Sequence, residues 1–157
     1  MKQQRWYNPL VKALLHSPFR RALGDTLLIT VTGRKSHSHY TTPVCYLRAG
    51  DTLLILTSAD RAWWKNLRGG APVTVDMEGN HFAGMGESFT ETSTVAEGLL
   101  LFLRSSQRYQ KAFHVSLDQE KQPDDPAALK QATVNVVLIR VSNLSVQEIS
   151  YEHAKGA

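Results

Sequence analysis

The sequence has a single cysteine, Cys45, and no apolar run near the ~20 residues that a membrane-spanning helix requires. One cysteine excludes an internal disulfide bond and a metal site built from several cysteines of this chain. The N-terminus lacks the continuous apolar stretch and the small-residue cleavage site that are typical of a secretory signal. Together these absences favour a cytoplasmic protein.

Motifs for several kinds of chemistry are also missing. The six histidines do not form a metal-binding pattern: His37 and His39 alternate by two, but no third ligand lies near them in the sequence. No activated nucleophile, strong general base or Walker-type phosphate loop is evident. We therefore expect no metal site.

What the sequence does contain is the composition of a folded protein. Its 157 residues are 42% hydrophobic and 20% charged, which is typical of a globular chain with one sizeable core. No internal repeat, low-complexity stretch or linker divides it. We expect one domain over residues 1–157.

The net charge of +4 is unevenly distributed. Seven lysines and arginines but only one acidic residue, Asp25, lie in the first 36 residues. This excess predicts an anionic partner: a phosphate-bearing ligand, nucleic acid or an anionic membrane surface. Nucleic acid is disfavoured, because the aromatic residues do not interleave with the cations and no helix-turn-helix or zinc pattern appears. Residues 5–23 combine an apolar stripe with basic residues, so peripheral membrane contact is an alternative to packing on the domain.

The pattern of strands and turns predicts an antiparallel β-structure with flanking helices. We expect a helical segment over 1–24, barrel strands over 25–90 with a short helix at 61–68, a long helix over 94–114, and a strand region over 133–150. The first three strands follow one another without crossover helices, which disfavours a parallel sheet. The expected class is therefore α+β, mainly β, with an antiparallel sheet or small barrel.

One turn between two expected strands is unusually basic. In TVTGRKSHSHYTTPVCY, residues 30–46, the first strand ends at Gly33 and the chain turns through Arg34, Lys35 and Ser36. Arginine supplies a planar fork of donors, lysine a point charge and serine a hydroxyl, all of which suit a phosphate. A solvated hairpin turn is the alternative that composition alone leaves open.

The sequence around this turn resembles the nitroreductase-type, deazaflavin-dependent oxidoreductases of the flavin-binding split β-barrel superfamily. The pattern TVTGRKSxxxxTTPVxYLRxGDTLLIxxS is followed by WWKNL and APVTV in that family's order, and the likeness covers roughly residues 8–90. The resemblance implies a split antiparallel β-barrel with helices closing its ends. It also implies coenzyme F-420, a deazaflavin with a phosphodiester and an oligoglutamate tail, which would pass a hydride to a quinone-like or nitro acceptor.

The resemblance assigns expected roles to individual residues. Those implied for cofactor binding are Arg34, Lys35, Ser36, Tyr40, Thr41, Thr42, Pro43, Val44, Ser58, Trp63 and Asn66. The first three would bind the phosphate and neighbouring acidic groups, and the strand 40–44 would pass along the ring edge with its backbone groups. Because an acceptor gains negative charge as hydride arrives, the hydroxyls of Ser58 and Tyr109 are the candidate catalytic donors.

Three positions depart from the family pattern. His37 stands where a glycine commonly follows the serine, Cys45 where an aromatic residue can shape the substrate pocket, and Ala59 where a polar residue or glycine is usual. The alternatives are thus a split barrel that binds FMN, or one that binds a lipid-like small molecule without turnover. We expect Cys45 to be a small buried residue of its strand. Exposed barrel edges leave a homodimer open.

Overall fold

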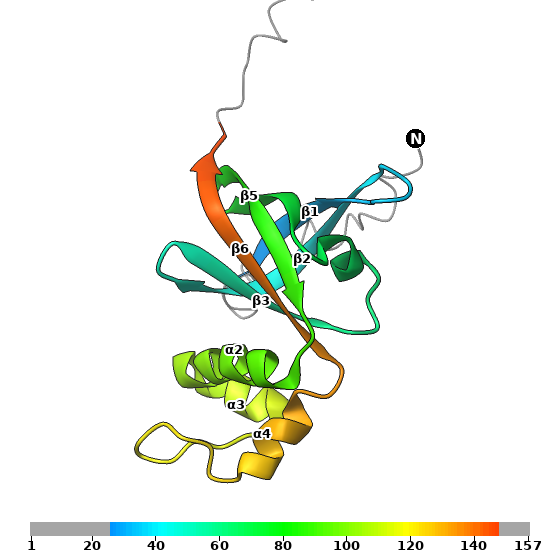
Figure 1. The fold of residues 1–157 in the computed structure, drawn as a ribbon. Coiled ribbons are helices and arrows are strands. Elements are labelled where there is room, and N and C mark those ends of the chain that lie inside the picture. The colour runs from blue at the N-terminus through cyan, green and yellow to red at the C-terminus, as the bar shows by residue number, and fades with distance from the viewer. Residues whose placement is uncertain (1–25, 148–157) are drawn as a thin grey trace, which may run out of the picture.

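The computed structural model describes residues 26–147, whose six strands form a closed barrel in the order β1-β2-β3-β6-β5-β4 (Figure 1). The strands are β1 (Thr26–Thr32), β2 (His39–Ala49), β3 (Thr52–Ser58), β4 (Ala71–Met77), β5 (Asn80–Phe89) and β6 (Val136–Val146). Every strand pairing is antiparallel. The predicted α+β class, mainly β, with an antiparallel barrel and flanking helices is confirmed.

Alternation along the strands builds the barrel core. In β1 the side chains of Leu27, Ile29 and Val31 are each at most 1% exposed, and the residues between them are more exposed. This is the period of two that a strand imposes on its side chains. The short helix expected over 61–68 is a 3₁₀ helix, η2 (Trp63–Leu67), which adds two buried tryptophans and a leucine to the same core.

The barrel is split beside β2. Residues His39–Cys45 pair with β1, whereas only Tyr46–Ala49 pair with β3. The last residues of β3, Leu56–Ser58, pair with β6 instead. Among the described residues, no strand therefore pairs with β2 over 41–44 on the side away from β1.

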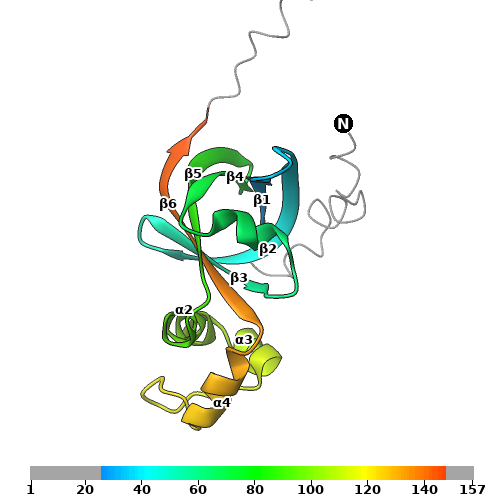
Figure 2. The ribbon, with the colours of Figure 1, turned by 45° about the vertical axis from the view of Figure 1, so that its right-hand side comes forward.

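Three helices lie together on one side of the barrel (Figure 2). They are α2 (Thr92–Ser105), α3 (Gln107–Phe113) and α4 (Pro126–Ala132). Buried Val95 and Phe102 of α2 pack with Leu54 of β3 and Leu138 of β6, so α2 covers the outer face of these two strands.

The expectation of a single helix over 94–114 is wrong. Ser106 is extended, with φ −161° and ψ 138°, and it separates α2 from α3. Its hydroxyl accepts a hydrogen bond from the backbone N–H of Arg108 at 3.2 Å. Serine is among the preferred N-cap residues because it satisfies an otherwise unpaired N–H of the new helix.

Two of the expected segments extend beyond the described residues. The N-terminal segment 1–24, with the membrane contact through 5–23, lies outside the described residues, as does the end of the strand region 133–150. Over residues 26–147, no helix combines the length and apolar character needed to cross a membrane.

The expectation that Cys45 is buried is wrong. This residue is exposed, because it lies between the buried, inward-facing Val44 and Tyr46 and its side chain points to the opposite face.

Candidate functional site: a basic pocket

A pocket lies between the β1–β2 turn and η2. Its volume is about 770 Å³, within the range of sites for small molecules and cofactors. Its lining residues are Gly33, Arg34, Lys35, Ser36, Tyr40, Arg61, Ala62, Trp63, Lys65, Asn66 and Arg68. The pocket thus joins two segments that are well separated in the sequence.

The β1–β2 turn is held by its own hydrogen bonds. The Gly33 N–H donates to the Ser38 carbonyl at 2.7 Å, and the His37 N–H donates to the Gly33 carbonyl at 2.9 Å. The Ser36 hydroxyl accepts from the Ser38 N–H at 3.2 Å and lies 3.1 Å from the Tyr40 hydroxyl. His37 has φ 57°, in the left-handed region that favours glycine. The turn therefore adopts a glycine-type conformation with a histidine at that position.

Further hydrogen bonds join this turn to η2. The Arg34 backbone N–H donates to Asn66 Oδ1 at 3.1 Å, and Asn66 Nδ2 donates to the Trp63 carbonyl at 3.1 Å. The Arg34 guanidinium donates through Nη2 to the Arg68 carbonyl, and the same nitrogen lies 3.4 Å from the Gly70 carbonyl oxygen. Residue 34 therefore contacts η2 through both its backbone and its side chain.

Positive charge dominates the pocket. Its cations are Arg34, Lys35, Arg61, Lys65 and Arg68, and no aspartate or glutamate occurs among the described lining residues. Residues 26–147 contain no group of three or more histidine, cysteine, aspartate or glutamate side chains that could hold a metal ion. Cations without a counter-charge suit phosphate and carboxylate groups. The lining of the pocket therefore has the chemistry that suits an anionic ligand.

Two of these cations lie close to the face of the Trp64 ring. Arg68 Cζ lies 5.1 Å and Lys65 Nζ 6.0 Å from the ring centroid, distances at which a cation is attracted to an aromatic face. The ring is itself fixed, because Trp64 is 4% exposed and its Nε1 donates to the Ala59 carbonyl at 3.2 Å.

The structure brings half of the predicted site residues into this pocket. Those that line it are Arg34, Lys35, Ser36, Tyr40, Trp63 and Asn66. Those that do not are Thr41, Thr42, Pro43, Val44, Ser58 and Tyr109. The expected phosphate-binding turn and the expected opposite wall are thus neighbours, although they are far apart in the sequence.

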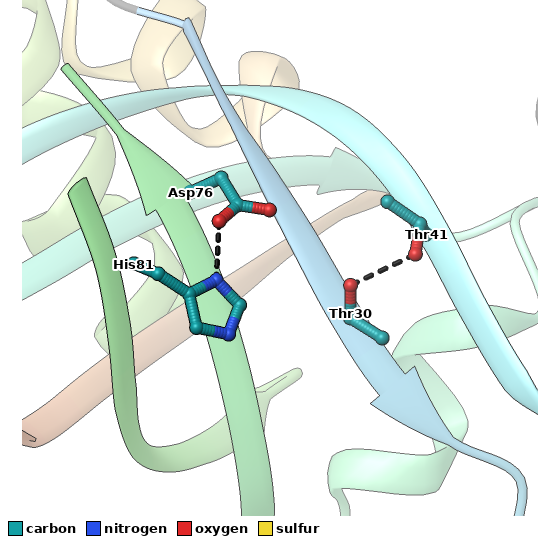
Figure 3. Close-up of polar contacts among 4 residues, drawn as sticks. All are labelled: Thr30, Thr41, Asp76 and His81. Atoms are coloured by element: carbon teal, nitrogen blue, oxygen red, sulfur yellow. Dashed lines mark hydrogen bonds and ion pairs between the residues drawn. The ribbon is translucent and has the colours of Figure 1, made fainter. Parts of the chain in front are cut away.

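The predicted strand residues after Tyr40 alternate across the barrel wall. Val44 is buried in the core, whereas Thr41 pairs with Thr30 on the outer face, where their hydroxyl oxygens are 2.8 Å apart (Figure 3). β2 therefore presents different side chains to the core and to the outside. Elsewhere on the barrel, Figure 3 also shows the contact between His81 Nδ1 of β5 and Asp76 Oδ1 of β4.

The two candidate catalytic hydroxyls belong to different elements. Ser58 ends β3 and is exposed; its Oγ donates to Asp60 Oδ2 at 3.3 Å and accepts from the Asp60 N–H at 3.3 Å. Tyr109 lies on α3 and packs edge-on against Phe102, with ring centroids 5.2 Å apart and an interplanar angle of 82°. Neither side chain lines the basic pocket.

Three pocket cations were not among the predicted site residues: Arg61, Lys65 and Arg68. A signal for them is present in the sequence, since they are spaced by four and three residues in a segment expected to be helical. Residues at that spacing lie on one face of a helix. In the structure only Lys65 lies within η2, so the spacing alone does not reveal that all three cations meet the β1–β2 turn.

The chain is similar to a known protein family and to several solved structures. A family model described as F420H(2)-dependent quinone reductase matches residues 16–111. No curated protein gives a significant match to the chain. A solved structure described as a domain-swapped dimer has a TM-score of 0.50 and 15% identity, and the match covers 88% of this chain and 98% of that one.

Two further solved structures are similar at lower scores. One, described as an F420 reductase, has a TM-score of 0.43 and 13% identity over 85% of this chain and 94% of that chain. The other is the general stress FMN/FAD binding protein from Xanthomonas citri, with a TM-score of 0.44 and 19% identity over 80% of this chain and 82% of that chain.

Proposed function

The chain belongs to the F420H(2)-dependent quinone reductase family and is therefore a coenzyme F-420-dependent oxidoreductase; on that premise we propose that its acceptor is a hydrophobic quinone-like or nitro compound. Reduced coenzyme F-420, when bound, supplies the hydride. The residues of this chain bind the cofactor, orient the two reactants and exclude water, which is where an enzyme of this kind lowers the barrier.

The observation that supports placing the cofactor in this pocket is the pocket's charge. Five cations line it, and no carboxylate is found among its described lining residues. The phosphodiester and oligoglutamate tail of coenzyme F-420 are anionic along their length, so these residues fit the group. We assign the phosphate to the turn at Lys35 and Ser36, and the acidic tail to Arg61, Lys65 and Arg68.

The split in the barrel supports a position for the ring. Over 41–44, β2 pairs with β1 alone among the described strands. Backbone polar groups on the other edge of the strand are available in the way that a sheet edge is. We assign the deazaflavin edge to Thr41–Val44, which follow Tyr40 of the pocket wall directly.

Ser58 and Tyr109 keep their proposed role as donors to the acceptor. The Ser58 hydroxyl now donates to Asp60, so it would have to exchange that partner for the acceptor. A hydrogen bond that strengthens in the transition state affects kcat more than KM. Ser58→Ala is expected to lower kcat about 10-fold, less than the roughly 100- to 1,000-fold loss for a preorganised donor, because the exposed Ser58 hydroxyl already has Asp60 as a partner. Tyr109→Phe is expected to lower kcat less.

Turnover tests the proposed acceptor class. Oxidation of reduced coenzyme F-420 would be followed by absorbance with a naphthoquinone, with a nitroaromatic compound and without an acceptor. We expect acceptor-dependent oxidation with at least one of the two compounds. Cofactor binding without turnover of either compound would contradict the proposal and favour a binding protein. Faster turnover with reduced FMN would keep the fold and change the cofactor. The homodimer and the membrane contact stay predictions.

A further inference from the structure

We propose that Arg34 and Asn66 form a latch between the β1–β2 turn and η2, and that Arg34 is a positioning residue rather than the direct ligand of the phosphate. This inference rests on the proposed cofactor site and changes the division of roles within it. The family resemblance implies that Arg34, Lys35 and Ser36 act alike on the phosphate, whereas their contacts in the structure differ.

The first observation is the direction of the Arg34 side chain. Its Nη2 donates to the Arg68 carbonyl and lies 3.4 Å from the Gly70 carbonyl oxygen. A guanidinium is a rigid planar fork, so fixing one amino group fixes the orientation of the whole group. Carbonyl acceptors also reduce what this arginine offers to a ligand, because the donors of one amino group are already in use.

The second observation is how these carbonyls are presented. Gly69 and Gly70 follow Arg68, the residue after η2, with φ 75° and φ 95°. A Cβ added to either glycine would meet no atom within 4 Å. The glycines are therefore required for backbone conformation rather than for space. That conformation sets where the Arg68 and Gly70 carbonyls face the turn.

The third observation is Asn66, which uses both ends of its amide. Oδ1 accepts from the Arg34 backbone N–H at 3.1 Å, and Nδ2 donates to the Trp63 carbonyl at 3.1 Å. Asn66 therefore ties the backbone of the turn to the backbone of η2. With the guanidinium contact at Arg68, residue 34 is held to η2 at two points.

The other four cations have their charge available for a ligand. Within residues 26–147, the side chains of Lys35 and Arg61 make no hydrogen bond or ion pair. Lys65 and Arg68 lie over the Trp64 ring, which leaves their N–H donors to solvent or an anion. Because Lys35 is adjacent to Arg34 in the chain, the latch sets the position of Lys35 relative to the cations beside η2.

Amide hydrogen exchange of the protein without cofactor tests the latch alone. Arg34→Lys keeps the charge but not the planar fork, and Asn66→Ala removes the second contact. We expect both variants to exchange roughly 10-fold faster over 33–38 and over 65–70, because lost hydrogen bonds raise local opening. The control, Lys35→Gln, is expected to change exchange less than about 2-fold. Unchanged exchange in both latch variants would overturn the proposal.

Titration with coenzyme F-420 at two salt concentrations tests the division of roles. Arg34→Lys is expected to bind about 10-fold more weakly at both 0.05 M and 0.5 M NaCl, because it loses geometry and not charge. Lys35→Gln is expected to lose about 10-fold at low salt and only about 2-fold at high salt, because salt screens the charge it removes. Lys35→Arg, which keeps the charge, should lose less than about 3-fold.

The opposite pattern would overturn the proposal. If Arg34→Lys binds like the wild type while Arg34→Gln shows the salt-dependent loss of Lys35→Gln, Arg34 is a direct charge contact. Absence of coenzyme F-420 binding by the wild-type protein is a different failure. It would contradict the proposed function, and the exchange experiment on the free protein would still decide whether the latch exists.

Discussion

The helix-covered side of the barrel and its basic pocket are held together by different forces. Under α2, the side chains of Leu99, Phe102 and Leu103 are 0% exposed, so burial of apolar surface dominates there. At the pocket, the turn and η2 meet through hydrogen bonds of largely exposed groups, each of which contributes only about 0.5–1.5 kcal/mol. The comparison indicates that the first region supplies most of the stability, which leaves the second region free for the recognition that we propose.

The largest expected effect is on the helix-covered side. Phe102→Ala should lower the free energy of unfolding by about 3–5 kcal/mol, because it leaves a cavity among Leu54, Leu138 and Tyr109. Urea denaturation measures this change. Leu101→Ala on the same helix is the control, since Leu101 is 40% exposed and should change stability far less. Equal effects of the two substitutions on the free energy of unfolding would contradict the claim that buried apolar surface dominates stability under α2.

A close approach of α2 to β6 offers a second test on the same side. A Cβ at Gly98 would lie 2.7 Å from both δ-carbons of the buried Leu138. Gly98→Ala should therefore destabilise by about 1–2 kcal/mol, because overpacking outweighs the ~1 kcal/mol of helix propensity that alanine gains over glycine. Glu97→Ala, at an exposed neighbour on the helix, should stay within about 0.5 kcal/mol. A Gly98→Ala protein as stable as the wild type would show that α2 packs more loosely than described.

At the pocket, removal of a charge should weaken cofactor binding and hardly change stability, the reverse of what is expected for the core substitutions. Lys65→Gln and Arg68→Gln are each expected to weaken coenzyme F-420 binding about 10-fold at low salt, or ~1.4 kcal/mol. Their stability should change by about 0.5 kcal/mol or less, as for other surface positions. Lys111→Gln on α3 removes an exposed charge elsewhere and should leave the affinity unchanged. A comparable loss of affinity in that control would indicate a general charge effect instead of a site.

The smallest expected effect is at His37. Its φ of 57° costs about 1–2 kcal/mol for a residue with a Cβ, part of which glycine loses again as chain entropy. His37→Gly should therefore raise the free energy of unfolding by about 0.5 kcal/mol. His39→Gly in β2 should lower it, because glycine weakens a strand. Destabilisation by His37→Gly would point to a contact of the imidazole that the turn needs.

Much of the fold could be predicted from the sequence, because buried and exposed side chains alternate along a strand with a period of two. Val73 and Val75 of β4 are buried while Pro72 and Asp76 are exposed. The break at Ser106 was not predicted, because apolar residues continue at helical spacing through Tyr109 and Phe113. The extended backbone of Ser106 ends α2, and its hydroxyl caps α3; such local features leave little trace in periodicity.

The candidate site was only partly predictable. The Gly33-Arg34-Lys35-Ser36 turn was singled out by its residues, and Asn66 by family resemblance. The role of Arg34 depends on carbonyls 34 and 36 residues further along the chain, which any residue type supplies. Sequence reasoning identifies side-chain chemistry, whereas backbone acceptors are identified only once the fold has placed them.

The most direct test of the central claim is a fluorescence titration of the purified protein with coenzyme F-420 and with FMN. It would compare the wild type with an Arg34→Ala/Lys35→Ala variant, which removes the side-chain contact of the latch and the adjacent charge of Lys35. We expect the wild type to bind coenzyme F-420 at about 1 μM or tighter, near −8 kcal/mol, to prefer it to FMN, and to lose this binding in the variant. Failure of the wild type to bind coenzyme F-420, or binding that the double substitution leaves intact, would contradict the assignment of the basic pocket.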